Sequence, residues 1–239
     1  MQLEICAHSF KSALAAQQSG AHRIELCSEL SLGGITPSHG LIEKVCGELQ
    51  IPVHVLIRPR SGDFRYHADE MAVMLQDIAF AKAQGAAGIV SGVLDSNFQI
   101  DKTQTARLIA ASKGLEFTFH RAFDWTPQPL ESIKTLLELG VHRLLSSGQQ
   151  PTALQGLACL KQCLDLAQGH MSIMPGGGVR PVMIQDFVEA GFTDIHASAS
   201  TSHPGAKHPL PMHDFTYVSA GLQTESDPEI IAQFLEALQ

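Results

Sequence analysis

The chain alternates between short apolar runs and amphipathic segments, and this alternation limits the fold more than any other feature. Parallel strands need crossover connections, so repeated strand–helix units predict an α/β protein with a parallel sheet. Eight units in 239 residues fit a single (β/α)8 TIM-like barrel. An open doubly wound sheet is the alternative. The expected strands are residues 3–6, 23–27, 52–57, 88–91, 116–120, 141–145, 173–174 and 194–197.

Helix signals stand at the expected places between these runs. Ser9 is predicted to cap the first helix and Gly20 to end it, while Asp227 is predicted to cap the last helix, with Pro228 at its first position. The composition does not change before residue 199, so we expect one domain over residues 1–239. A long loop is expected at about residues 199–227, before the last helix.

Composition and charge exclude several classes of protein. The formal net charge is −8 and there is no run of lysine or arginine, which argues against a nucleic-acid partner. We expect no membrane partner, because no stretch reaches the 18 apolar residues of a membrane span. The five cysteines imply no disulfide framework, and the first residues do not resemble a signal peptide. A cytoplasmic location in a reducing compartment is therefore expected.

Three consecutive glycines predict an anion-binding loop near the end of the chain. Gly176, Gly177 and Gly178 follow an apolar run and precede a helix that Pro181 opens. Glycines at a strand end let backbone N–H groups approach a ligand, and barrels frequently hold phosphate in the loops after strands seven and eight. Ser198, which follows the eighth strand, is expected to join this site. The alternative is a tight turn that needs positive φ.

Two arginines follow the third expected strand. Arg58 and Arg60 are candidate ligands for the same anion, because a guanidinium binds phosphate or carboxylate through two hydrogen bonds. In a barrel, residues at the carboxyl ends of the strands form the site. Each arginine is also open to an ordinary structural ion pair.

Four further residues at the strands are candidates for acid–base catalysis. Glu4 and Glu25 lie on neighbouring expected strands at matching depth, and two close carboxylates raise the pKa of one of them. His120 ends the fifth expected strand and His196 lies in the eighth, and both are suited to proton transfer near neutral pH. The alternative is that the carboxylates pair with arginines and close the barrel floor.

A pair of cysteines gives a separate signal. Cys6 and Cys27 each stand two residues after a glutamate, on adjacent expected strands. Neighbouring strands lie about 4.8 Å apart, so the two sulfur atoms can meet. Two thiolates suit a soft ion such as Cu(I). Burial of two inert thiols is the alternative.

The chain resembles the CutC family over about residues 1–198. The resemblance implies a TIM-like barrel, a cytoplasmic homo-oligomer such as a homodimer, and a role in copper homeostasis with Cu(I) binding. The cysteines proposed as copper ligands in that family match Cys6 and Cys27 here. The strings that carry the resemblance are LEIC, GAHRIELCSELSLGGITPSHGLI, VHVLIRPRSGDFRY, SGVLD, FTFHRAFD, SSGQ and PGGGV.

The chain departs from the family pattern after His196. Relatives often carry an arginine-containing MRYRN-like string in the last loop, whereas here Lys207 is the only full cation of the segment ASASTSHPGAKHPLPMHDFTYVSAG. A ligand that this loop contacts in relatives would be held differently here. Two functions therefore remain open: a copper-homeostasis protein, and a barrel enzyme or binder for a phosphorylated or carboxylated small molecule.

Overall fold

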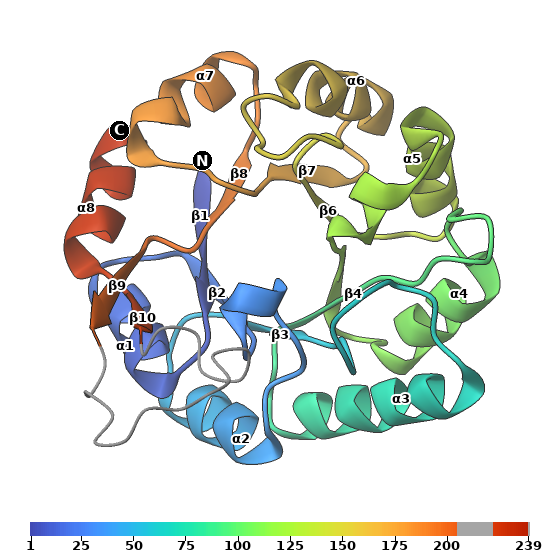
Figure 1. Cartoon of the computed structure of the whole chain (residues 1–239), viewed down its shortest axis with the longest axis horizontal. Helices are drawn as coiled ribbons and strands as arrows, with labels where there is room; N and C mark the ends of the chain where they lie inside the picture. Colours follow the sequence, from blue (N-terminus) through green and yellow to red (C-terminus); the bar gives the residue numbers. More distant parts are fainter. Residues whose placement is uncertain (205–221, 239) are drawn as a thin grey trace, which may run out of the picture.

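Eight parallel strands form the centre of the molecule, and helices surround them (Figure 1). The computed structural model describes residues 1–204 and 222–238. The prediction of a (β/α)8 barrel is confirmed, and the open doubly wound sheet is excluded. The barrel strands are β1 (Gln2–Ala7), β2 (Arg23–Leu26), β3 (Val53–Leu56), β4 (Gly88–Ser91), β5 (Glu116–Phe119), β6 (Arg143–Ser146), β7 (Ser172–Pro175) and β8 (Asp194–Ala197).

The strands follow the chain around the barrel, in the order β7-β6-β5-β4-β3-β2-β1-β8. β1 lies between β2 and β8, where Glu4 is opposite Arg23 on one side and His196 on the other. The ring closes between β7 and β8 through one isolated parallel bridge, which joins Gly176 to His196. This register brings residues from both ends of the chain to one side of the barrel.

Local capping explains where several helices begin. Ser9 accepts a hydrogen bond from the backbone N–H of Ser12, and Asp227 accepts one from Glu229, so both predicted caps are confirmed. The helices are α1 (Phe10–Gln18), α2 (His39–Glu48), α3 (Ala68–Ala83), α4 (Lys102–Ala111), α5 (Pro129–Glu138), α6 (Leu157–Ala167), α7 (Ile184–Glu189) and α8 (Pro228–Ala237). Short 3-10 turns cover Leu30–Leu32, Arg121–Trp125 and Pro181–Met183.

The sixth helix begins later than the sequence suggests. The sequence predicts a sixth helix over residues 152–167, but α6 begins at Leu157. The intervening residues form a turn in which Gly156 packs against the preceding loop. A Cβ atom at Gly156 would lie 1.9 Å from the carbonyl oxygen of Ser147, so this position requires glycine.

The segment expected to be a loop at about residues 199–227 carries strands at both of its ends, so that expectation is wrong there. β9 (Ser200–Pro204) pairs antiparallel with β10 (Leu222–Ser226). The backbone N–H of Ser226 also donates to Ser12 Oγ in α1 at 3.1 Å. Both strands are largely polar, so no apolar alternation marked them. Residues 205–221, which belong to the segment that departs from the family pattern, lie outside the described residues.

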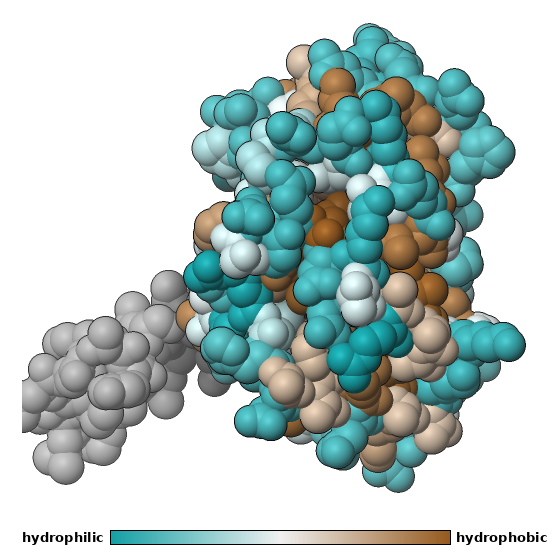
Figure 2. Space-filling model, turned by 90° about the vertical axis from the view of Figure 1, so that its right-hand side faces the viewer, coloured by the Kyte–Doolittle hydropathy of each residue, from teal (hydrophilic) through white to brown (hydrophobic). Residues whose placement is uncertain are grey.

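Alternate strand residues face two different environments. Leu3, Ile5 and Ala7 of β1 belong to the large apolar core between strands and helices, whereas Cys6 belongs to a small apolar cluster with Cys27. The face of the molecule in Figure 2 is mainly hydrophilic, with hydrophobic residues visible between the polar ones. Among the described helices, none is long and apolar enough to cross a bilayer.

Candidate functional site

A network of buried charges fills one part of the barrel interior. Arg23 donates from Nε to Glu4 at 2.5 Å and from Nη2 to Asp194 at 2.7 Å. Arg143 lies 3.4 Å from the same Asp194 oxygen and donates at 3.0 Å to Glu116, whose side chain is half-exposed at the edge of the network. Opposite charges thus compensate one another inside the barrel, as buried charges require. Neither arginine was predicted from the sequence as a site residue.

Glu4 connects this network to the carboxyl ends of the strands. His196 Nδ1 lies 2.8 Å from Glu4 Oε1 and 3.9 Å from Glu25 Oε2. Both carboxylates are buried, and His196 lies close to both of them. The expected matching depth of the two glutamates is wrong, because the register places Glu4 opposite Arg23 and Glu25 opposite Cys6. His120, the fourth candidate, lies outside this group, on the wall of a cavity that Glu25 and His196 also line.

The two carboxylates differ in their affinity for a proton. Burial alone would raise the pKa of Glu4, but Arg23 and the hydrogen bond to His196 outweigh it and hold the pKa well below its ordinary value. Burial raises the pKa of Glu25 to about 7, with Glu4 adding to the effect and His196 opposing it. Burial would lower the pKa of His196, but its carboxylate neighbours raise it above 6.5. Adjacent carboxylates thus differ in protonation at neutral pH.

Cys6 and Cys27 meet inside the barrel, as their spacing predicted. Their sulfur atoms are 3.5 Å apart, which is beyond the ~2.05 Å of a disulfide bond. Cys27 is fully buried and Cys6 is 7% exposed, on the wall of a cavity. The hydrogen bond with Cys27 and burial raise the pKa of the Cys6 thiol well above its ordinary value. Both cysteines are free thiols.

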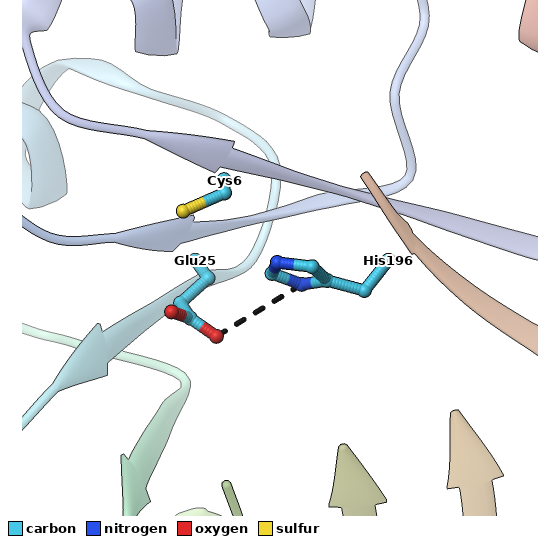
Figure 3. A group of neighbouring side chains, drawn as sticks. All are labelled: Cys6, Glu25 and His196. Carbon is cyan, nitrogen blue, oxygen red and sulfur yellow. Dashed lines mark ion pairs between the residues drawn. The ribbon is translucent and has the colours of Figure 1, made fainter. Parts of the chain in front are cut away.

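Cys6 belongs to a second group of donors as well (Figure 3). Cys6 from β1, Glu25 from β2 and His196 from β8 each offer one ligand atom, and the three atoms lie within 4.8 Å of one another. Figure 3 shows the imidazole beside the thiol and the carboxylate. A thiolate, an imidazole and a carboxylate are all protein ligands of transition metals. The structure therefore brings together residues that the sequence predicts separately for metal binding and for catalysis.

A cavity of about 310 Å³ opens beside these donors. It lies at the carboxyl ends of the strands, where barrels carry their ligand sites. Its wall combines the three donors with two arginines, a second histidine and part of the glycine loop. The lining residues are Cys6, Glu25, Leu30, Gly33, Leu56, Arg58, Phe64, His120, Arg121, Leu145, Gly177, Gly178, Val179, His196, Ala197 and Ser198.

Only some of the expected anion ligands line the cavity. Arg58, Gly177, Gly178 and Ser198 line it, whereas Arg60 and Gly176 do not. The Arg60 guanidinium pairs with Glu70 at 2.5 Å and with Asp63 at 3.2 Å. Gly176 donates its N–H to Ser146 and forms the bridge that closes the barrel.

Arg121 lines the cavity and was not among the expected anion ligands. It follows His120 directly in the string FHRAFD, so its position after a strand was the available signal. Its Nε donates to Asp124 at 2.8 Å, and its Nη2 donates to Ser147 at 2.8 Å. These contacts hold the guanidinium against Gly177, where an added Cβ atom would lie 3.3 Å from Nη1.

Comparison with known proteins identifies the relatives of this chain. The model of the CutC family matches residues 1–201. A CutC family protein of Histophilus somni is 44% identical over 231 residues, covering 96% of this chain and 93% of the relative. The human copper homeostasis protein cutC homolog is 46% identical over 207 residues, covering 86% and 76%. The crystal structure of CutC from Streptococcus agalactiae has a TM-score of 0.78 and 32% identity, covering 83% of this chain and 98% of that one. As its motifs predicted, the chain belongs to the CutC family.

Proposed function

We propose that this chain takes part in copper homeostasis by binding Cu(I) through Cys6 and Cys27. The observation that carries the proposal is the 3.5 Å separation of two free thiols at the wall of a cavity. The names of the human and mouse relatives, which are copper homeostasis protein cutC homologs, support the same metal. Soft thiolate ligands favour Cu(I) over the hard divalent ions.

The surroundings of the pair suit an ion that enters and leaves through the cavity. Cys6 lines the cavity and Cys27 lies behind it, so an ion meets Cys6 first. His196 offers an imidazole nitrogen next to Cys6, and imidazole is also a copper ligand. Reduced thiols persist in the cytoplasm, which supports a cytoplasmic location for this function.

A titration of the reduced protein with Cu(I), in competition with a chromophoric Cu(I) chelator, tests the proposal. We expect one tightly bound ion per chain, and we expect the Cys6→Ser/Cys27→Ser double variant to lose it. The matched control is Cys46→Ser/Cys159→Ser, because these two cysteines are half-buried and lie on α2 and α6, away from the cavity. The control should bind like the wild type. Equal Cu(I) affinity in the two double variants would refute the proposal.

X-ray absorption at the copper edge gives a second readout. The loaded wild-type protein should show two sulfur neighbours around copper. A spectrum with only nitrogen and oxygen neighbours would contradict a cysteine pair even if an ion binds.

A further inference from the structure

Arg58 places a buried positive charge on the wall of the cavity. Arg58 is only 5% exposed, and its guanidinium donates to the carbonyl oxygens of Leu32 at 2.9 Å, Gly34 at 2.7 Å and Gly62 at 3.0 Å. Within residues 1–204 and 222–238, no carboxylate pairs with it and its Nε–H has no acceptor. Carbonyl groups orient the guanidinium but carry no net negative charge. A buried charge without a counter-charge is costly.

His120 places a second hydrogen-bond donor without an acceptor on this wall. Its Nδ1 accepts the backbone N–H of Ala122 at 3.2 Å, so the proton of the neutral ring is on Nε2. Burial and the charge of Arg58 lower the pKa of His120 to about 3, which keeps the ring neutral. In the described part of the chain, Nε2 has no hydrogen-bond partner. A buried donor without an acceptor costs about 1–3 kcal/mol.

Arg121 and the glycine loop extend the positive wall to the mouth of the cavity. The Arg121 side chain is 45% exposed, and its ion pair with Asp124 uses Nε, which leaves Nη1 beside Gly177 at the cavity. Gly177 and Gly178 have φ values of 108° and 67°, which only glycine adopts readily. Because these residues lack side chains, a ligand in the cavity meets their backbone directly.

We propose that the cavity binds a small anionic metabolite, with its anionic group held by Arg58 and Arg121 beside the backbone of Gly177 and Gly178. The ligand supplies the acceptors that Arg58 Nε and His120 Nε2 lack, and the counter-charge that Arg58 lacks. The volume of about 310 Å³ lies at the lower end of small-molecule sites, so the ligand has few carbon atoms. A phosphate monoester and a dicarboxylate share the required chemistry. The inference does not depend on copper binding.

Thermal unfolding at constant ionic strength tests the proposal. The probes are inorganic phosphate, glycerol 3-phosphate and malonate, with glycerol as the neutral control. A ligand that binds only the native state raises the unfolding midpoint by mass action. We expect a saturable rise with at least one anion and none with glycerol. A response to the phosphates alone indicates a phosphate monoester, and a response to malonate alone indicates a carboxylate.

Three arginine variants locate the binding site. Arg58→Gln and Arg121→Gln should each lower the affinity for the anion that raises the midpoint at least tenfold. Arg60→Gln should leave that affinity unchanged, because Arg60 lies outside the cavity and pairs with Glu70 and Asp63. If Arg58→Gln does not fold, Arg121→Gln decides, because its side chain is half-exposed. The absence of a saturable rise, or equal affinities in all folded variants, would overturn the inference. Cys27→Ser should keep anion binding, because Cys27 does not line the cavity, and this separates the outcome from that of the copper titration.

Discussion

His196 Nδ1 and Glu4 Oε1 lie 2.8 Å apart across the junction of β8 and β1. Through this contact, a residue of the candidate metal site is attached to the buried charges of the barrel interior. Glu4 also accepts from Arg23 at 2.5 Å, so one carboxylate holds a donor of the site and a structural arginine at the same time. Stability and site geometry therefore depend on the same side chain.

Replacement of Glu4 should be strongly destabilising. Glu4→Gln leaves Arg23 and His196 without their shared carboxylate in a buried environment, and we expect a loss of about 3–5 kcal/mol in the free energy of unfolding. Glu116→Gln is the matched control, because the Glu116 side chain is 50% exposed and pairs with Arg143 at 3.0 Å. It should cost less than about 1 kcal/mol. Urea unfolding measures both, and similar losses would contradict a central role for Glu4.

The stability of the protein should depend on pH through His54. Burial lowers the pKa of His54 from 6.5 to about 4, and Arg143 adds to the shift while Glu4 opposes it. Between these two values, acidification protonates His54 in the unfolded chain but not in the folded chain. The folded state therefore loses stability as the pH falls from about 6.5 towards 4, by about 1 kcal/mol per pH unit.

His54→Gln removes this titration and isolates it from the other ionisable groups. Relative to the variant, the wild type should lose free energy of unfolding as the pH falls from 7 to 5, in urea titrations at each pH. A constant difference between the two proteins over that range would show that His54 has an ordinary pKa in the folded state.

The role of His196 in metal binding can be separated from that of the cysteines. His196→Gln should weaken Cu(I) binding at least about tenfold if the imidazole is a third ligand, since even groups outside the ligand set change metal affinity 10–100-fold. His39→Gln is a suitable control, because His39 is largely exposed on α2. Competition with a chelator measures both affinities. Wild-type affinity in His196→Gln would leave the ion with the two sulfurs alone.

Gly177 should be intolerant of a side chain for two reasons that a matched variant separates. Its φ is 108°, and a Cβ atom would lie 3.2 Å from Ser147 Cβ and 3.3 Å from Arg121 Nη1. Gly85 has a similar φ of 86° but open space around it. Gly85→Ala should therefore cost about 1–2 kcal/mol through backbone strain alone. Gly177→Ala should cost more and displace Arg121, which thermal unfolding and anion binding both report.

The arrangement of the barrel could be predicted from sequence because each strand and helix carries its own local signal. The strand predicted at residues 194–197 matches β8, and Ser9 and Asp227 cap helices as expected. The hairpin of β9 and β10 could not be found in this way, because backbone pairing between two polar segments leaves no apolar pattern. The start of α6 was also missed, since it depends on the close packing of Gly156 against Ser147.

The candidate site could be predicted only where the adjacency of two strands is enough to bring residues together. Cys6 and Cys27 meet because they lie near the carboxyl ends of adjacent parallel strands, although the register pairs Cys6 with Glu25. Arg58 and Arg60 have the same spacing signal, yet only Arg58 lines the cavity, because Glu70 and Asp63 pair with Arg60 in the following segment. Which arginine is free for a ligand depends on loop geometry, which a single sequence does not encode in any periodic pattern.

The single bridge between Gly176 and His196 has a consequence for the cooperativity of the barrel. The neighbouring junction of β6 and β7 has four register pairs, so β7 and β8 are joined far more weakly by backbone hydrogen bonds. Amide hydrogen exchange reports such local differences in opening free energy. His196 and Gly177 border this junction and line the same cavity. A ligand that contacts both residues would connect two strands that share a single isolated backbone bridge. Ligand binding should therefore slow amide hydrogen exchange at the junction of β7 and β8.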